Sequence, residues 1–135
     1  MTEKSYYTPL SAYYLKEAKR IKQTIVWEAK FTHTDRLSFK CLAPHQEDWL
    51  LRAETGASFK IPDEGRGQKP FDGTVWYRAK ALFVAIYYKP RATEIYEIPI
   101  RVFLKEKYES GDKSLTATKA KEISVKSIKL STRQP

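Results

Sequence analysis

Residues 24–31, TIVWEAKF, constrain the fold more than any other part of the chain. The segment is rich in β-branched and aromatic residues and contains neither glycine nor proline, so it predicts a β-strand. Successive side chains of a strand point to opposite faces. One face of this strand is apolar throughout and consists of Ile25, Trp27, Ala29 and Phe31. We therefore expect a central strand that is covered on both faces.

The opposite face of the same strand carries two charged residues, Glu28 and Lys30, two positions apart. Burying a charge costs several kcal/mol unless the charge is paired, hydrated or bound to a metal ion. A functional site explains why both charges occupy a strand that is otherwise hydrophobic. The alternative is an edge strand whose polar face is solvated.

Two helices flank this strand along the chain. The first is predicted over residues 9–22, where apolar residues recur at helical spacing and Ser11 can cap the N-terminus. The second is predicted over residues 44–55, with Pro44 in its first turn and Gly56 as its C-terminal stop. The residues of the second helix expected to face the core are Trp49, Leu50 and Ala53.

Further strands are predicted in the middle of the chain. Segments 37–42 and 58–62 each predict a short strand, 74–88 predicts two strands joined near residues 78–80, and 93–104 predicts one more with Pro99 at or beyond its end. The fold class is therefore α/β, with a mixed central β-sheet flanked by helices. Residues 1–135 are expected to form a single domain of this kind.

The charge balance favours a polyanionic partner, with nucleic acid as the leading candidate. The chain has 25 Lys and Arg residues against 16 Asp and Glu residues, which gives a formal net charge of +9. Lysines are frequent and acids are few in a basic tail from about residue 105, where one short helix is expected after Ser114.

Several classes of protein are disfavoured by composition. The longest apolar stretch, residues 81–88, is too short to cross a bilayer, and the polar start lacks a signal peptide, so we expect no membrane and a cytoplasmic protein. A single cysteine, Cys41, excludes an intrachain disulfide, and two histidines argue against structural zinc. A hard metal ion held by carboxylates stays open.

Glu28 and Lys30 have the spacing and chemistry that metal-assisted phosphodiester hydrolysis requires. A glutamate and a nearby aspartate can ligate Mg²⁺ or Mn²⁺. A lysine beside them can orient water and stabilise the charge that builds up on the phosphate. We interpret this pair as the centre of a candidate active site.

The stretch from residue 26 to residue 56 resembles the PD-(D/E)XK nuclease superfamily, and most closely its Holliday-junction resolvase branch. The motifs that carry the resemblance are Glu28-Ala29-Lys30, Leu37-Ser38-Phe39 and the helix start His45-Gln46. It covers roughly residues 10–104 and implies a restriction-endonuclease-like fold and Mg²⁺-dependent cleavage of DNA. It implies that Gln46 is a hydrogen-bonding residue of the site and that Glu17 is an auxiliary acid. A branched DNA substrate and a homodimer are compatible with it.

The chain departs from this family at the metal-binding aspartate that normally lies on a strand before the Glu-x-Lys motif. Residues 19–26 contain no acid. Asp63 and Asp72 are the candidate substitutes, with Asp72 preferred and Asp35 weaker. A second alignment takes Pro70-Phe71-Asp72-Gly73 as the aspartate motif and Tyr87-Tyr88-Lys89 as the other half, but that half has no acid and ranks lower.

Two other functions remain as alternatives. The first is a non-catalytic nucleic-acid-binding module, with a degenerate nuclease fold or a small β-barrel. The second is a protein-interaction or inhibitor protein whose basic surface binds an acidic partner. Metal-dependent cleavage distinguishes the nuclease from the first alternative, and salt-sensitive DNA binding argues against the second.

Overall fold

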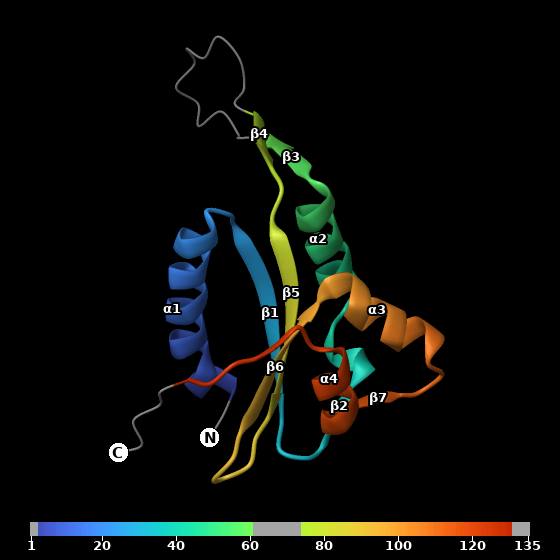
Figure 1. Ribbon diagram of the computed structural model, residues 1–135. Coiled ribbons are helices and arrows are strands. Elements are labelled where there is room, and N and C mark those ends of the chain that lie inside the picture. Colours follow the sequence, from blue (N-terminus) through green and yellow to red (C-terminus); the bar gives the residue numbers. More distant parts are fainter. Residues whose placement is uncertain (1–2, 61–73, 131–135) are drawn as a thin grey trace.

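The computed structural model describes residues 3–60 and 74–130 of the chain (Figure 1). In chain order its elements are α1 (Glu3–Ile21), β1 (Ile25–Thr32), β2 (Arg36–Ser38), the 3-10 helix η1 (Phe39–Cys41), α2 (Pro44–Thr55), β3 (Ala57–Lys60), β4 (Thr74–Tyr77), β5 (Lys80–Tyr87), β6 (Glu94–Pro99), α3 (Ile100–Glu109), β7 (Ser114–Thr116), α4 (Ala117–Ile123) and β8 (Lys126–Ser127).

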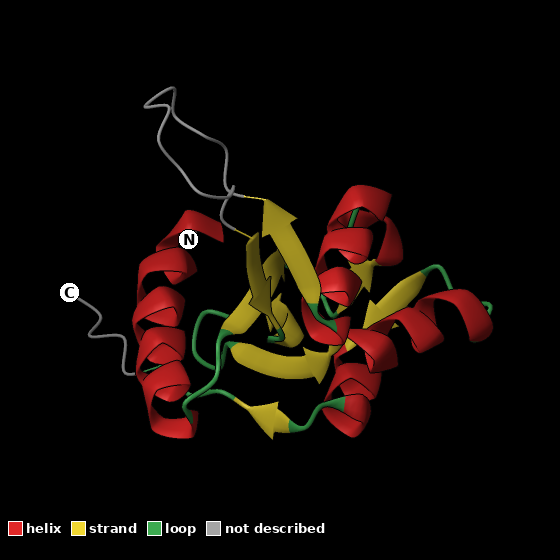
Figure 2. Cartoon of the chain, turned by 90° about the horizontal axis from the view of Figure 1, so that it is seen from above, coloured by secondary structure: helices red, strands yellow, loops and turns green. Residues whose placement is uncertain are grey.

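The main sheet has four strands in the order β1-β5-β6-β8. β1 runs parallel to β5, while β6 is antiparallel to both β5 and β8. Two small antiparallel pairs, β2 with β7 and β3 with β4, complete the strands among the described residues. The expected α/β class with a mixed central sheet flanked by helices is therefore confirmed (Figure 2).

The expectation that β1 is a central strand is wrong for the described part of the chain. β1 is the end strand of its sheet, and β5 lies inside it. Every residue from Ala81 to Tyr87 is buried. β1 is nevertheless largely apolar, because helices cover both of its faces.

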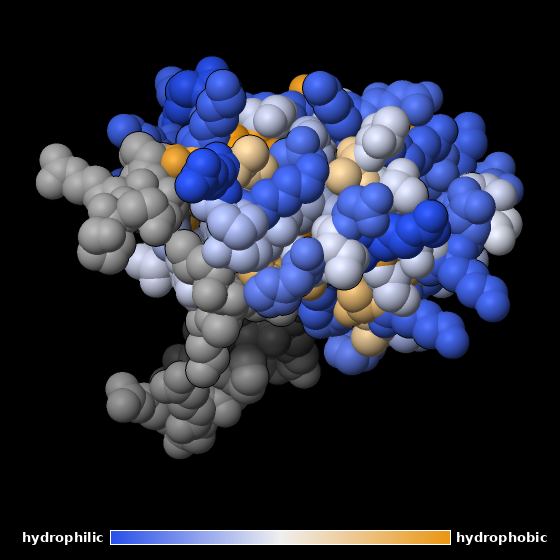
Figure 3. All heavy atoms as spheres, turned by 90° about the horizontal axis from the view of Figure 1, so that it is seen from below, coloured by the Kyte–Doolittle hydropathy of each residue, from blue (hydrophilic) through white to orange (hydrophobic). Residues whose placement is uncertain are grey.

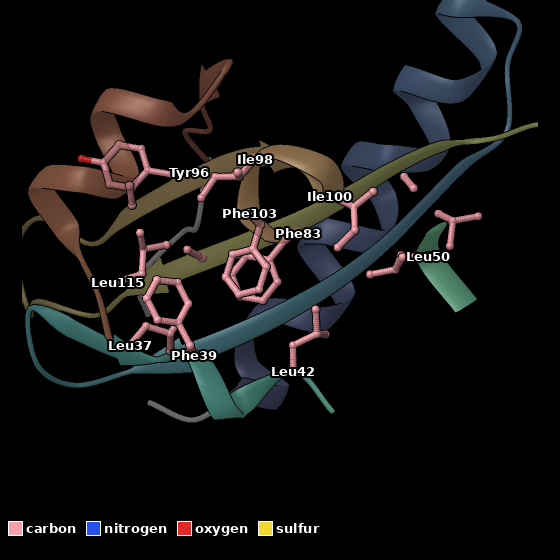
Figure 4. Packing of buried hydrophobic residues seen from close by; sticks show 14 of the residues in the cluster. Leu37, Phe39, Leu42, Leu50, Phe83, Tyr96, Ile98, Ile100, Phe103 and Leu115 are labelled. Carbon is pink, nitrogen blue, oxygen red and sulfur yellow. The ribbon is translucent and has the colours of Figure 1, made fainter. Parts of the chain in front are cut away.

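α1 packs on one face of the sheet, and α2, α3 and α4 pack on the other (Figures 1 and 2). On the α1 side, Tyr6, Leu10 and Tyr14 lie four residues apart and meet the apolar side chains of β1 and β5. On the other side, the stacked rings of Phe83 and Phe103, with centroids 3.9 Å apart, lie at the centre of the larger core (Figure 4). The sheet is thus the middle of three layers.

Two helices differ from the prediction. α1 begins at Glu3 rather than at residue 9, so Ser11 lies inside the helix and does not cap it. The extra turns form because Tyr6 buries its ring against the sheet. α3 follows the strand predicted within 93–104, and no helix was expected at this place. Pro99 ends that strand, and Ile100 and Phe103 then bury one helical face.

α2 has the predicted bounds, but one of the three residues predicted to face the core is exposed. Leu50 and Ala53 lie in the core as expected. Trp49 does not, because 47% of its surface is exposed. The helical spacing of Leu50 and Ala53 turns the neighbouring Trp49 side chain toward solvent.

The most deeply buried carboxylate among the described residues is Glu97 on β6, which is 2% exposed. It accepts a hydrogen bond of 2.9 Å from the hydroxyl of Tyr14, and Lys80 Nζ lies 3.8 Å from its other oxygen. These partners compensate the charge and tie α1 to the sheet.

This contact predicts a loss of stability at alkaline pH. Burial, reinforced by the charge of Glu97, raises the pKa of Tyr14 above its ordinary value of 10.0. Above about pH 10 the unfolded chain loses this proton while the folded chain keeps it, so the free energy of unfolding falls as the pH rises. We expect the free energy of unfolding, measured with urea between pH 8 and 11, to fall less steeply with pH for Tyr14→Phe than for the parent protein. Equal declines would contradict this assignment.

Candidate functional site

β1 directs Glu28 and Lys30 toward α2, on the sheet face opposite to α1. Lys30 Nζ lies 3.4 Å from Glu28 Oε1, and the two side chains are 19% and 20% exposed. Each charge is therefore half-buried and partly compensated by the other. Water still reaches both groups, so a charged ligand can compete with the pairing.

Gln46 joins this pair from the first turn of α2. The backbone N–H of Ala43 donates a 3.0 Å hydrogen bond to Gln46 Oε1. This contact at the helix N-terminus orients the side-chain amide. The amide Nε2 then donates to Glu28 Oε1 over 3.3 Å. The structure thus brings together Glu28, Lys30 and Gln46, which are 18 residues apart at the extremes.

The base of this site is part of the hydrophobic core. Glu28 lies opposite Phe83 in the parallel pairing of β1 with β5. The ring of Phe83 is fully buried and stacks on Phe103 of α3 (Figure 4). The backbone that carries Glu28 is therefore fixed by its pairing with β5, whose Phe83 side chain is packed in the core.

The structure does not bring Glu17 to this cluster. Glu17 lies on α1, at the opposite face of the sheet, where it pairs with Arg20 and lies 3.9 Å from Lys126 Nζ. The hydrogen bond from Arg20, with the charge of Lys126, lowers the pKa of the Glu17 carboxyl below its ordinary range. The contact with Lys126 links α1 to β8.

The candidate metal ligands Asp63 and Asp72 lie outside the described residues. Asp35 is exposed in the turn after β1, where its backbone carbonyl accepts a hydrogen bond from Ala117. Within residues 3–60 and 74–130, no group of three or more His, Cys, Asp or Glu side chains is placed to hold a metal ion.

The alternative alignment places its motif at the end of β5. Tyr87 is fully buried there, and its hydroxyl donates a 2.8 Å hydrogen bond to the carbonyl of Leu115. Lys89 follows the strand and lies 3.7 Å from Glu94. Tyr87 thus links β5 to β7, which is a structural role.

Trp49 is exposed on α2, three residues after Gln46, although its sequence pattern indicated a core residue. On a helix, Trp49 lies about 60° around the axis from Gln46 and about 200° from Glu47. Gln46 contacts β1, whereas Glu47 contacts Lys107 and Tyr108 of α3. Trp49 therefore lies on the flank of α2 that faces away from α3, on the side of the β1 edge. The spacing of three residues indicates in the sequence that Trp49 and Gln46 lie on neighbouring parts of the helix surface.

Comparison with protein-family models, curated proteins and solved structures finds no match to this chain. The cluster of Glu28, Lys30 and Gln46 consequently carries the functional interpretation. No helix in the described part of the chain has the length and apolar character needed to cross a membrane.

Proposed function

We propose that this protein is a metal-dependent endonuclease that hydrolyses DNA phosphodiester bonds, with branched DNA as a candidate substrate. The observation that carries the proposal is the contact of Gln46 and Lys30 with a single oxygen of Glu28. A carboxylate, an ammonium group and an amide on rigid elements form a site in which an anionic substrate can be bound and oriented.

Each of the three residues has a distinct role in this proposal. Glu28, together with Asp72 or Asp63, would hold Mg²⁺ or Mn²⁺. The metal ion, when bound, supplies an activated water and compensates the phosphate charge. Lys30 turns from Glu28 toward the phosphate and stabilises the negative charge of the transition state. Gln46 holds the Glu28 carboxylate in position and is a positioning residue.

Two further features support a nucleic-acid substrate. The formal net charge of +9 attracts a polyanion. The exposed ring of Trp49, on the same helix as Gln46, offers a surface on which a base can stack. Positive charge and an accessible aromatic ring are both features that nucleic-acid-binding surfaces use.

A cleavage assay tests this function directly. Linear, flapped and four-way DNA are incubated with the protein, each with Mg²⁺ and with EDTA. We expect cleavage of at least one substrate that depends on Mg²⁺, and faster cleavage of the four-way substrate would assign the branched specificity. Absence of cleavage on all three, with either Mg²⁺ or Mn²⁺, would contradict a nuclease.

The second candidate is a non-catalytic nucleic-acid-binding module. It is supported by the formal net charge of +9, which attracts a polyanion without any cleavage chemistry. This module would bind DNA with an affinity that falls as salt rises, and it would leave the DNA intact with Mg²⁺. The same cleavage assay, run beside a binding titration, separates the two functions.

A further inference from the structure

A second candidate site lies on the other side of the sheet, at the end of the molecule where β5 turns into β6. A hollow of about 430 Å³ lies there between the start of α1, the β5–β6 turn and the chain that follows β8. We call it the Tyr88 pocket. Its main lining residues are Tyr6, Tyr88, Arg91, Thr93, Ile128 and Lys129.

Three segments far apart in sequence build this pocket. The chain after β8 crosses the sheet to reach the N-terminal end of α1, beside the β5–β6 turn (Figure 1). Seen from this end, the surface is mostly hydrophilic, with smaller hydrophobic areas between the polar residues (Figure 3). Ile128 is buried at the base of the pocket and anchors the crossing chain through its backbone N–H, which donates to the carbonyl of Ile95 over 2.8 Å.

The aromatic wall of the pocket is held by a cluster of rings. The ring centroid of Phe31 lies 5.6 Å from that of Tyr6 and 5.8 Å from that of Tyr88. His33 meets Tyr88 edge-on at 5.4 Å. Tyr88 itself is half-buried, so part of its ring remains accessible while its neighbours fix its orientation. A fixed, accessible ring can stack on a planar ligand with little loss of conformational entropy.

The polar groups of the pocket suit a ligand that has both hydrogen-bonding edges and negative charge. The hydroxyls of Tyr6 and Thr93 lie 3.2 Å apart, and either one can donate or accept. Arg91 and Lys129 are exposed at the rim. Lys89, by contrast, lies 3.7 Å from Glu94. The rim therefore carries positive charge next to an aromatic and apolar interior.

We propose that the Tyr88 pocket binds an unpaired nucleotide of single-stranded DNA. The base lies against Tyr88 and the apolar wall, and Arg91 and Lys129 bind the flanking phosphates. An apolar ligand would not require the two cations, and a simple anion would not require the aromatic wall. The proposal rests on the proposed nucleic-acid function, but it does not depend on cleavage, because the pocket lies on the opposite sheet face from Glu28.

Binding of a fluorescein-labelled 12-nucleotide oligo(dT), measured by anisotropy in EDTA, tests the pocket apart from any cleavage. The variant Arg91→Ala/Lys129→Ala is compared with Lys105→Ala/Lys121→Ala, which removes the same charge from exposed positions on α3 and α4. We expect the affinity of the pocket variant for oligo(dT) to fall by about tenfold or more, and that of the control to fall much less. Only the pocket variant loses cations that contact the bound phosphates, and with them the counterion release that these contacts cause. Equal losses would overturn the proposal.

A second pair of variants tests the stacking contact. Tyr88→Phe is expected to retain affinity for oligo(dT), whereas Tyr88→Leu is expected to lose roughly 5-fold to 100-fold, the range for one base–aromatic stack. Circular dichroism confirms that each variant is folded. A Tyr88→Leu protein that is folded and binds normally would overturn the proposal. So would a glutamate-rich peptide that displaces the oligonucleotide from this pocket.

If the protein cleaves DNA but these variants bind normally, the pocket proposal fails and the nuclease stands. If the variants lose single-strand binding and no cleavage is detected with Mg²⁺ or Mn²⁺, the pocket stands and the nuclease fails.

Discussion

Replacing Glu28 with glutamine is expected to lower metal-dependent DNA cleavage by roughly a thousandfold or more. Glutamine has nearly the same shape as glutamate, so it can still accept the hydrogen bond from Gln46. It lacks the negative charge that binds a divalent cation, and the loss of several kcal/mol of transition-state stabilisation gives this large decrease. Single-turnover cleavage of the best DNA substrate is the measurement.

Glu17→Gln is the matched control for Glu28→Gln. It removes the same charge from the opposite face of the sheet, where Glu17 pairs with Arg20. We expect its cleavage rate to stay at the level of the parent protein and the DNA affinity of both variants to change little. A Glu28→Gln protein that cleaves at the parental rate would exclude Glu28 as a metal ligand. An equal loss in both variants would indicate a general effect of charge.

Replacing Phe83 with alanine is expected to lower the free energy of unfolding by about 3–5 kcal/mol. The Phe83 ring is fully buried and stacks on Phe103, with ring centroids 3.9 Å apart. Its removal leaves a cavity between β5 and α3, at the position that pairs with Glu28. Urea unfolding at neutral pH measures the change.

Phe83→Leu is the control, because leucine refills most of the space and should recover more than half of the lost stability. If Phe83→Ala lowered the unfolding free energy by less than about 1 kcal/mol, the described core packing would be contradicted. A cavity beside Glu28 is also expected to slow cleavage in the fraction that stays folded, because Glu28 would lose its rigid base.

Local patterns in the sequence predict the parts of the fold that depend on near neighbours. Helix α2 has its predicted bounds because Pro44 starts it and Gly56, with a φ of 93°, ends it. Helix α4 follows Ser114 as expected, with Thr116 as its N-cap residue. Strand alternation also places Glu28 and Lys30 on one face, and the structure pairs them.

The candidate site is only partly predictable from the sequence, because some of its contacts join segments that are far apart in the chain. The contact of Gln46 with Glu28 joins a helix start to a strand, and the resemblance to a nuclease motif indicated both residues. The place of Glu17 depends on which sheet face α1 covers, and no local pattern fixes that face. Its position near Arg20 and Lys126 therefore emerges only from the assembled layers.

The sequence by itself determined that residues 24–31 form an apolar strand with two charges on one face, which the structure has at 25–32, and that a helix ending at Gly56 follows it. Strand period and helix end signals decide these features within a few residues. The tertiary structure decided that β1 is an end strand, that helix α3 follows the strand ending at Pro99, and that Trp49 is exposed. These features depend on which distant segments pair and pack, and burial against those segments outweighs local propensity.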